Sequence, residues 1–205
     1  MSQLRQQQKA RRRQQISDTA LQLFADQGFQ ETTIEQIARE AQVSPPTVFN
    51  YFGSKQEILL ELLVQADGRA VRESRAQLAN YSDPLDALCD LESRLVGYAL
   101  DAMPPELWRQ LLPAVLRGGD DGVAGKYQAL NSRLQREIAL ILRELQRLGT
   151  LRQDLDVELA AFLLNDYSHL QLLRLVNQTP PDLAAHRAQV RRTSQLILEG
   201  MLPRP

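Results

Sequence analysis

The residues of this chain that could perform covalent chemistry are few, and their spacing does not suit catalysis. Ser168 and His169 are adjacent and Asp166 is close by, but neighbouring residues on a helix point in different directions and cannot form a triad among themselves. The sequence has no Gly-x-Ser-x-Gly, no His-Glu-x-x-His and no glycine loop that would cradle a phosphate. One cysteine, Cys89, and two histidines exclude an intramolecular disulfide and a Cys/His metal cluster. We therefore expect a protein that is not an enzyme and that carries no metal or cofactor.

Residues that suit binding, by contrast, gather at the N-terminus. Five basic residues precede the first acidic residue, Asp18: Arg5, Lys9, Arg11, Arg12 and Arg13. The whole chain has a formal net charge of only -1, so this run is a local asymmetry. It predicts a basic arm over residues 1–13 that is attracted to phosphate groups; a solvated tail or the start of a helix is the alternative.

The composition favours helices throughout. Leu, Ala, Arg, Gln and Glu dominate, and aromatic residues make up only 5% of the chain, which predicts an all-α protein of about nine helices. No apolar run is long enough to cross a membrane, and the N-terminus lacks the apolar core of a signal peptide. Together with the single cysteine, this predicts a cytoplasmic protein without a membrane partner.

The elements that position the candidate binding residues begin after the basic arm. Ile16, Ala20, Leu23 and Phe24 share one face of a first helix, which Gly28 ends. Phe29 is expected to fold back onto the last turn of that helix.

A second and a third helix follow closely. Thr32 or Thr33 can form a capping box at the start of the second, because Glu35 and Gln36 stand three residues further on. Ser44 caps a third helix over about residues 45–52, with Pro45 tolerated in its first turn. A fourth begins after Ser54, which forms a capping box with Glu57. Short helices joined by a tight turn are the outline of a helix-turn-helix.

Residues 28 to 60, GFQETTIEQIAREAQVSPPTVFNYFGSKQEILL, closely resemble the DNA-binding signature of the tetracycline-repressor (TetR) family. The resemblance implies a three-helix DNA-binding domain over residues 14–62, with residues 45–52 as the recognition helix, and a regulatory and dimerisation domain over residues 63–205. It also implies double-stranded operator DNA as the partner. The DNA contacts expected from the resemblance and the basic arm are Arg11, Arg12, Arg13, Thr33, Ser44, Pro45, Pro46, Thr47, Phe49, Asn50, Tyr51 and Lys55.

Two positions depart from the family pattern. Position 42, in the tight turn, is usually glycine, because a left-handed backbone there costs a residue with a Cβ about 1 kcal/mol or more; here it is Gln42. Position 49 is usually tyrosine, and Phe49 lacks the hydroxyl that the family often directs at DNA. One such hydrogen bond is worth about 0.5–1.5 kcal/mol, enough to alter base preference without abolishing binding.

Apolar stripes on the last two helices predict a homodimer. They can pack inside the monomer or against a second subunit, and the resemblance favours a four-helix interface between subunits. The interface residues expected are Leu159, Phe162, Leu163, Leu170, Leu173, Leu183, Val190, Ile197 and Met201.

The resemblance also implies an effector pocket between the helices of residues 84–178. The expected ligand is an apolar or amphipathic small molecule, and the few polar handles are Tyr98, Trp108, Tyr127, Asn165, Tyr167 and His169, each of which can equally be an ordinary core residue. We expect a repressor that the effector releases from a palindromic operator. In the alternative, the C-terminal domain binds a protein partner in place of a small ligand.

Overall fold

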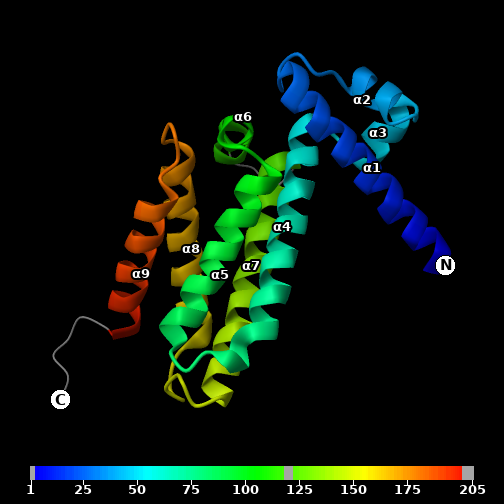
Figure 1. Cartoon of the computed structure of the whole chain (residues 1–205). Helices are drawn as coiled ribbons and strands as arrows, with labels where there is room; N and C mark the ends of the chain where they lie inside the picture. Colours follow the sequence, from blue (N-terminus) through cyan, green and yellow to red (C-terminus); the bar gives the residue numbers. More distant parts are fainter. Residues whose placement is uncertain (1–2, 118–121, 200–205) are drawn as a thin grey trace. The chain divides into compact units, whose positions relative to one another are not determined.

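The computed structural model describes residues 3–117 and 122–199, and within these ranges it is all-helical, which confirms the predicted fold class (Figure 1). Within these ranges one 3-10 turn, η1 (Leu78–Asn80), lies between the fourth and fifth α-helices. The nine α-helices of the described ranges are α1 (Gln3–Gln27), α2 (Ile34–Glu40), α3 (Pro45–Tyr51), α4 (Lys55–Gln77), α5 (Pro84–Ala102), α6 (Pro105–Leu116), α7 (Gly122–Arg147), α8 (Val157–Val176) and α9 (Leu183–Glu199).

The chain forms two compact units. The first contains residues up to 63 together with 110–127, and the second contains 64–109 together with 128 onward. Three helices, α4, α6 and α7, begin in one unit and continue into the other, so the backbone of α4 joins the two without a loop.

The first unit buries the apolar face that the sequence predicts. Ile16 and Ala20 of α1 are inaccessible to solvent, and so is Val48 of α3. Gly28 ends α1 with φ +89°, the left-handed conformation expected of a helix-ending glycine. The ring of Phe29 lies 4.9 Å from that of Phe24, so the expected return onto the last turn is confirmed.

The basic arm is part of α1. Helix α1 begins at Gln3, so residues 3–13 form its first turns and are not a separate segment. Between a solvated tail and a helix start, the structure therefore shows the helix start, and phosphate binding by these basic residues stays a prediction. The side chains from Leu4 to Arg12 are exposed, whereas that of Arg13 is half-buried.

The second unit has one continuous apolar core. Helices α4, α5, α7 and α8 each contribute to it, and it includes the fully buried Ile141, Leu145 and Ala161. Helix α9 packs against α5 and α8.

Candidate functional site

The short helices of the first unit are held by local caps. The hydroxyl of Thr33 accepts from the N–H of Gln36 at 3.1 Å, while the Gln36 amide oxygen accepts from the N–H of Thr33 at 2.7 Å. Thr33, and not Thr32, therefore forms the capping box of α2. Thr32 is buried and donates to the carbonyl of Gly28. The start of α2 is thus fixed by residues three apart in the sequence.

Helix α3 begins in the same way. Ser44 accepts from the N–H of Thr47 at 3.3 Å, and the two hydroxyls lie 2.8 Å apart. Pro45 and Pro46 occupy the first turn, where an N–H is not needed. The cap therefore leaves both hydroxyls at the N-terminal end of α3.

The outward face of α3 carries most of the predicted DNA contacts. Val48 and the C-cap residue Phe52 are buried, as expected, and this orients the rest of the helix. Phe49 is 52% exposed, an unusual state for a phenylalanine, and Asn50 is also exposed. The remaining predicted contacts on this face are Ser44 and Pro46, which are exposed, and Pro45, Thr47 and Tyr51, which are half-buried. A helix that presents an apolar ring beside amide and hydroxyl groups can contact thymine methyls and base edges in a major groove.

The turn before α3 adopts the conformation that its sequence disfavours. Gln42 has φ +53°, and it is the one residue other than glycine with positive φ in the described ranges. The turn therefore keeps the left-handed geometry in spite of the Cβ at this position.

A basic groove lies between α1 and the end of α3. Its volume is about 880 Å³, and it is open to solvent. Arg5, Lys9, Arg11 and Arg12 line it from α1, and Tyr51 lines it from α3. Arginine and lysine side chains around an open groove are suited to contact the phosphates of a nucleic acid.

Arg13 has a different role from its neighbours. Its Nε donates to the Glu61 carboxylate at 2.6 Å, its Nη1 donates to the carbonyl of Tyr51 at 3.0 Å, and its guanidinium lies 4.4 Å from the centre of the Phe52 ring. These contacts tie α1 to α3 and α4. Of the three arginines predicted to contact DNA, Arg13 is engaged within the protein.

Lys55 is also engaged within the protein. Its ammonium donates to the carbonyls of Phe29, at 2.5 Å, and Thr32, at 2.7 Å, and it lies 4.5 Å from the centre of the Phe29 ring. Burial lowers the pKa of this ammonium, and the charge of Glu31 opposes that shift. The sequence missed this role because the carbonyls belong to a loop about 25 residues earlier.

The apolar face predicted for dimerisation is exposed in the single chain. Large side chains that are 37–54% exposed lie on α8 and α9: Leu159, Phe162, Leu163, Leu170, Leu183 and Ile197, joined by Leu196, which the sequence analysis omitted. Leu173 is half-buried, and Met201 lies outside the described residues. The prediction of Val190 as an interface residue was wrong, because its side chain is only 3% exposed and packs inside the monomer. The inward face of α9 therefore runs through His186, Val190 and Ser194.

No cavity found among residues 3–117 and 122–199 brings together the six polar residues predicted for an effector pocket. Tyr167 lines a small cavity of about 20 Å³ between α5 and α8, and Tyr127 is half-buried near the start of α7. The side chain of Asn165 donates to Asn131 at 2.7 Å, and His169 Nδ1 lies 2.9 Å from the carbonyl oxygen of Asn165. Trp108 is buried, and its Nε1 has no hydrogen-bond partner in the part of the chain that the structure describes.

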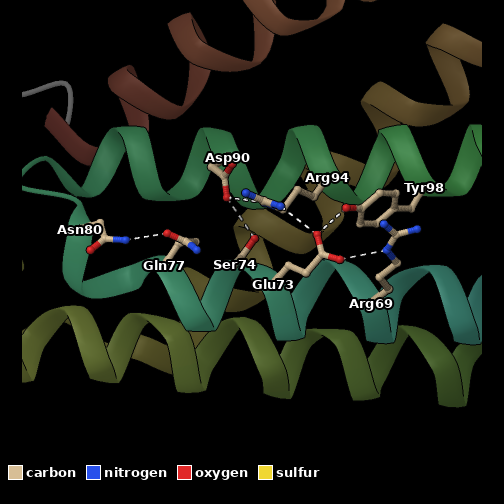
Figure 2. Close-up of polar contacts among 8 residues, drawn as sticks. All are labelled: Arg69, Glu73, Ser74, Gln77, Asn80, Asp90, Arg94 and Tyr98. Atoms are coloured by element: carbon tan, nitrogen blue, oxygen red, sulfur yellow. Dashed lines mark hydrogen bonds and ion pairs between the residues drawn. The ribbon is translucent and has the colours of Figure 1, made fainter.

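Tyr98 belongs to a polar network between α4 and α5. Figure 2 shows Glu73 of α4 facing Arg94 and Tyr98 of α5, and the Tyr98 hydroxyl donates to the Glu73 carboxylate. Arg94 donates to Glu73 at 2.9 Å and to Asp90 at 2.7 Å. Hydrogen bonds from Tyr98 and Arg69 lower the pKa of Glu73 to about 2. This network fastens α4 to its neighbour rather than opening onto a cavity.

Comparison with known proteins identifies the family. The family model "Bacterial regulatory proteins, tetR family" matches residues 16–62, and the model "TetR/AcrR family transcriptional repressors, C-terminal domain" matches residues 64–200. The chain belongs to the TetR family. It is therefore a TetR-family transcriptional regulator with an N-terminal helix-turn-helix.

Individual TetR-family relatives match in sequence and in structure. The regulators HbdR of Aromatoleum sp. (strain CIB) and TcmR of Streptomyces glaucescens are 41% and 35% identical over 38% and 48% of this chain. The matches span only 34% and 43% of those two proteins. The crystal structure of Thermus thermophilus FadR, a TetR-family repressor in complex with lauroyl-CoA, is 33% identical. It covers 94% of this chain and 96% of its own, with a TM-score of 0.73.

The described ranges contain neither a candidate membrane span nor a candidate metal-binding cluster. None of the helices there combines the length and the apolar character that a membrane span requires. Nor do three or more His, Cys, Asp or Glu side chains gather there in a way that could hold a metal ion.

Proposed function

We propose that this TetR-family regulator is a homodimeric repressor that binds a palindromic operator and is released by a small-molecule effector. The observation that carries the DNA-binding part is the outward face of α3, where Phe49 and Asn50 are exposed beside the basic groove of α1. In this arrangement α3 enters the major groove, and Arg11 and Arg12 contact the flanking phosphates. Thr33 and Ser44, at the N-terminal ends of α2 and α3, add contacts to the backbone.

Dimerisation rests on the exposed apolar face of α8 and α9. Leucines, isoleucine and phenylalanine that are about half exposed on two neighbouring helices form a patch that a second subunit can cover. A two-fold dimer would place two copies of α3 in successive major grooves, about 34–36 Å apart, and would read a palindrome.

For the effector we propose a fatty acyl thioester, bound by the second unit once its core opens, since the cavity between α5 and α8 has a volume of only about 20 Å³. The support comes from Thermus thermophilus FadR, whose structure contains lauroyl-CoA. Three buried polar atoms have no partner among the described residues and could be satisfied by a ligand: Trp108 Nε1, Asn165 Oδ1 and Gln171 Nε2. Gln171 was not among the residues expected from the sequence, because it stands within the apolar run of α8.

Release would follow from a shift between two conformations. An effector that binds the second unit more tightly in one state biases the whole dimer toward that state. Helix α4 joins the units without a loop and would carry the change to α3. The proposal places this cycle in the cytoplasm, where operator DNA lies.

Selection of bound genomic fragments by the purified protein tests DNA recognition. The expected result is enrichment of one palindromic sequence. On that operator, Thr47→Ala should weaken binding about tenfold, whereas Thr47→Ser, which keeps the hydroxyl near Ser44, should weaken it less. Failure to enrich any sequence would contradict the operator proposal.

The salt dependence of operator binding tests the role of α1. Each phosphate contact that is lost should reduce the slope of log affinity against log salt by about 0.9. Arg12→Gln should therefore lower the slope, whereas Arg13→Gln should act mainly on protein stability, because Arg13 is bound to Glu61 and Tyr51. Equal slopes for wild type and Arg12→Gln would exclude Arg12 as a phosphate contact.

Light scattering tests the proposed dimer interface. Ile197→Asp should give a monomeric mass by light scattering, whereas Leu140→Asp, at an exposed leucine of α7, should remain dimeric.

Lauroyl-CoA should release the operator in a titration in which free coenzyme A does not. If neither compound releases the protein from the operator, acyl thioesters are excluded as effectors, and the proposal of DNA binding is unaffected.

A further inference from the structure

A groove between α4 and α7 of the second unit holds an unusual set of side chains. Its volume is about 230 Å³. Apolar residues Val64, Val71, Leu130 and Leu134 line part of it. Figure 1 shows the two helices side by side over this stretch. The groove contains none of the residues that the sequence predicted for an effector pocket.

Two of the three arginines that line the groove have no ion-pair partner there. Arg75 is paired with Glu137 at 3.3 Å, so these two charges offset each other. Arg72 and Arg133 make neither a hydrogen bond nor an ion pair with any described residue, and both are exposed. Two unpaired guanidinium groups that line one groove can bind a single carboxylate or phosphate group.

Asp67 lies between the two helices in the same groove. Desolvation by burial raises the pKa of its carboxyl to about 7, although the charge of Arg133 opposes the shift. No hydrogen bond reaches this carboxyl from the described residues. Burial favours the neutral form of this carboxyl, and the neutral form can donate a hydrogen bond to an anion.

Gly68 gives the groove its depth. A glycine within a helix costs about 1 kcal/mol relative to alanine, and nothing in the backbone of α4 requires one here. A Cβ at this position would lie 3.3 Å from Nη1 of Arg72, and a larger side chain would extend into the groove. An unpartnered carboxyl and an interior glycine are both unfavourable for stability, and adjacent features of this kind are typical of a binding site.

We propose that the α4–α7 groove binds a small amphiphilic carboxylate, with its carboxylate between Arg72 and Arg133 and its short apolar chain against the valines and leucines. A volume of about 230 Å³ corresponds to about eight water molecules, so a medium-chain acid fits and a whole coenzyme A ester does not. The groove is distinct from the core site proposed for the thioester. Only its effect on operator binding rests on the proposed function, since α4 continues into the first unit.

Calorimetric titration of the full-length protein with octanoate tests the site without DNA. Octanoate should bind, whereas octylamine and octanol should bind at least tenfold more weakly. Arg72→Gln and Arg133→Gln should each weaken octanoate binding about tenfold, whereas Arg136→Gln, at an exposed arginine of α7 outside the groove, should not. Octanoate binding that is unchanged in both groove variants would overturn the proposal, as would binding of free coenzyme A in its place.

Substitutions at Gly68 and Asp67 separate the site from general stability. Gly68→Leu should abolish binding, because its side chain would extend into the groove; circular dichroism checks that the variant folds. Wild-type binding should weaken as pH rises from about 6 to about 8, because Asp67 loses its proton, and Asp67→Asn should bind with less dependence on pH. The other charged groups that line the groove are Arg72, Arg75, Arg133 and Glu137. Equal binding to Gly68→Leu and to wild type would place octanoate elsewhere. If octanoate binds as expected but the operator complex is unaffected, the groove stands and its regulatory role fails.

Discussion

The polar contacts that begin the short helices of the first unit are local, whereas a buried polar pair of the second unit joins two helices that are far apart in the chain. In the first unit Thr33 pairs with Gln36 and Ser44 with Thr47, so caps three residues apart set the start of each short helix. In the second unit the buried His186 of α9 pairs with Glu92 of α5, 94 positions earlier. The first pattern holds a fixed surface, because each cap is complete in itself. The second makes helix positions depend on one another, which suits the change of state proposed for this unit.

The largest expected effect on stability comes from removing the contact between His186 and Glu92. His186 and Glu92 are 7% and 5% exposed and lie 2.9 Å apart, so His186→Ala leaves a carboxylate buried without its partner. We expect the free energy of unfolding, measured in urea at fixed protein concentration, to fall by about 3 kcal/mol.

A matched exposed pair provides the control. Arg191 of α9 contacts Asp86 of α5 at 2.7 Å with both side chains about half exposed, so Arg191→Ala should lower the free energy of unfolding much less than His186→Ala does. Equal losses for the two variants would mean that burial does not distinguish the pairs. Glu92→Leu combined with His186→Leu should recover most of the lost stability, because no buried charge remains.

The next effect concerns the pH dependence of the second unit. The pKa of Asp67 is about 7 in the folded protein, above the ordinary value of 3.8. Between these two values the folded state holds a proton that the unfolded state has lost, so the contribution of this group to stability falls as pH rises. Relative to Asp67→Asn, wild type should lose about 1–2 kcal/mol between about pH 5.5 and about pH 8. Parallel stability curves for the two proteins would show that the Asp67 carboxyl is not desolvated.

The same contrast between local and long-range contacts explains how much of each unit could be predicted from the sequence. The helix ends around Gly28 and Ser44 depend on neighbouring residues, and the pattern of the sequence was sufficient to place them. Arg13 looked like its neighbours Arg11 and Arg12, and only the fold shows that Glu61 binds it. A charge pattern identifies an arginine but does not reveal a partner 48 positions away.

The second unit was predictable only in its helices. Apolar spacing placed Val190 on a seam with Ile197, but the same spacing fits a helix that packs on α5, and Val190 is buried there. The α4–α7 groove was not predicted, because it depends on which faces of two distant helices meet. Gly68 was a signal in the sequence, since an interior helix glycine needs a reason.

A smaller effect tests whether the caps of the first unit act locally. Thr33→Ala removes the hydroxyl that accepts from Gln36 and should lower the free energy of unfolding by about 1 kcal/mol, whereas Thr33→Ser should retain most of it. Octanoate binding by the second unit should be the same in both variants. A change in octanoate affinity would show that this cap is not independent of the second unit.

The smallest effect has the opposite sign. Gln42 holds φ +53°, which is costly for a residue with a Cβ, and its side chain is exposed without a hydrogen bond to the described residues. Gln42→Gly should therefore raise the free energy of unfolding by about 0.5 kcal/mol, because relief of this strain exceeds the added freedom of glycine in the unfolded chain. Gln42→Ala is the control, since it removes the same side chain but keeps the Cβ, and it should be neutral. A glycine variant no more stable than the alanine variant would show that the turn accommodates Gln42 without strain. The departure from glycine would then bear on the DNA surface rather than on the fold.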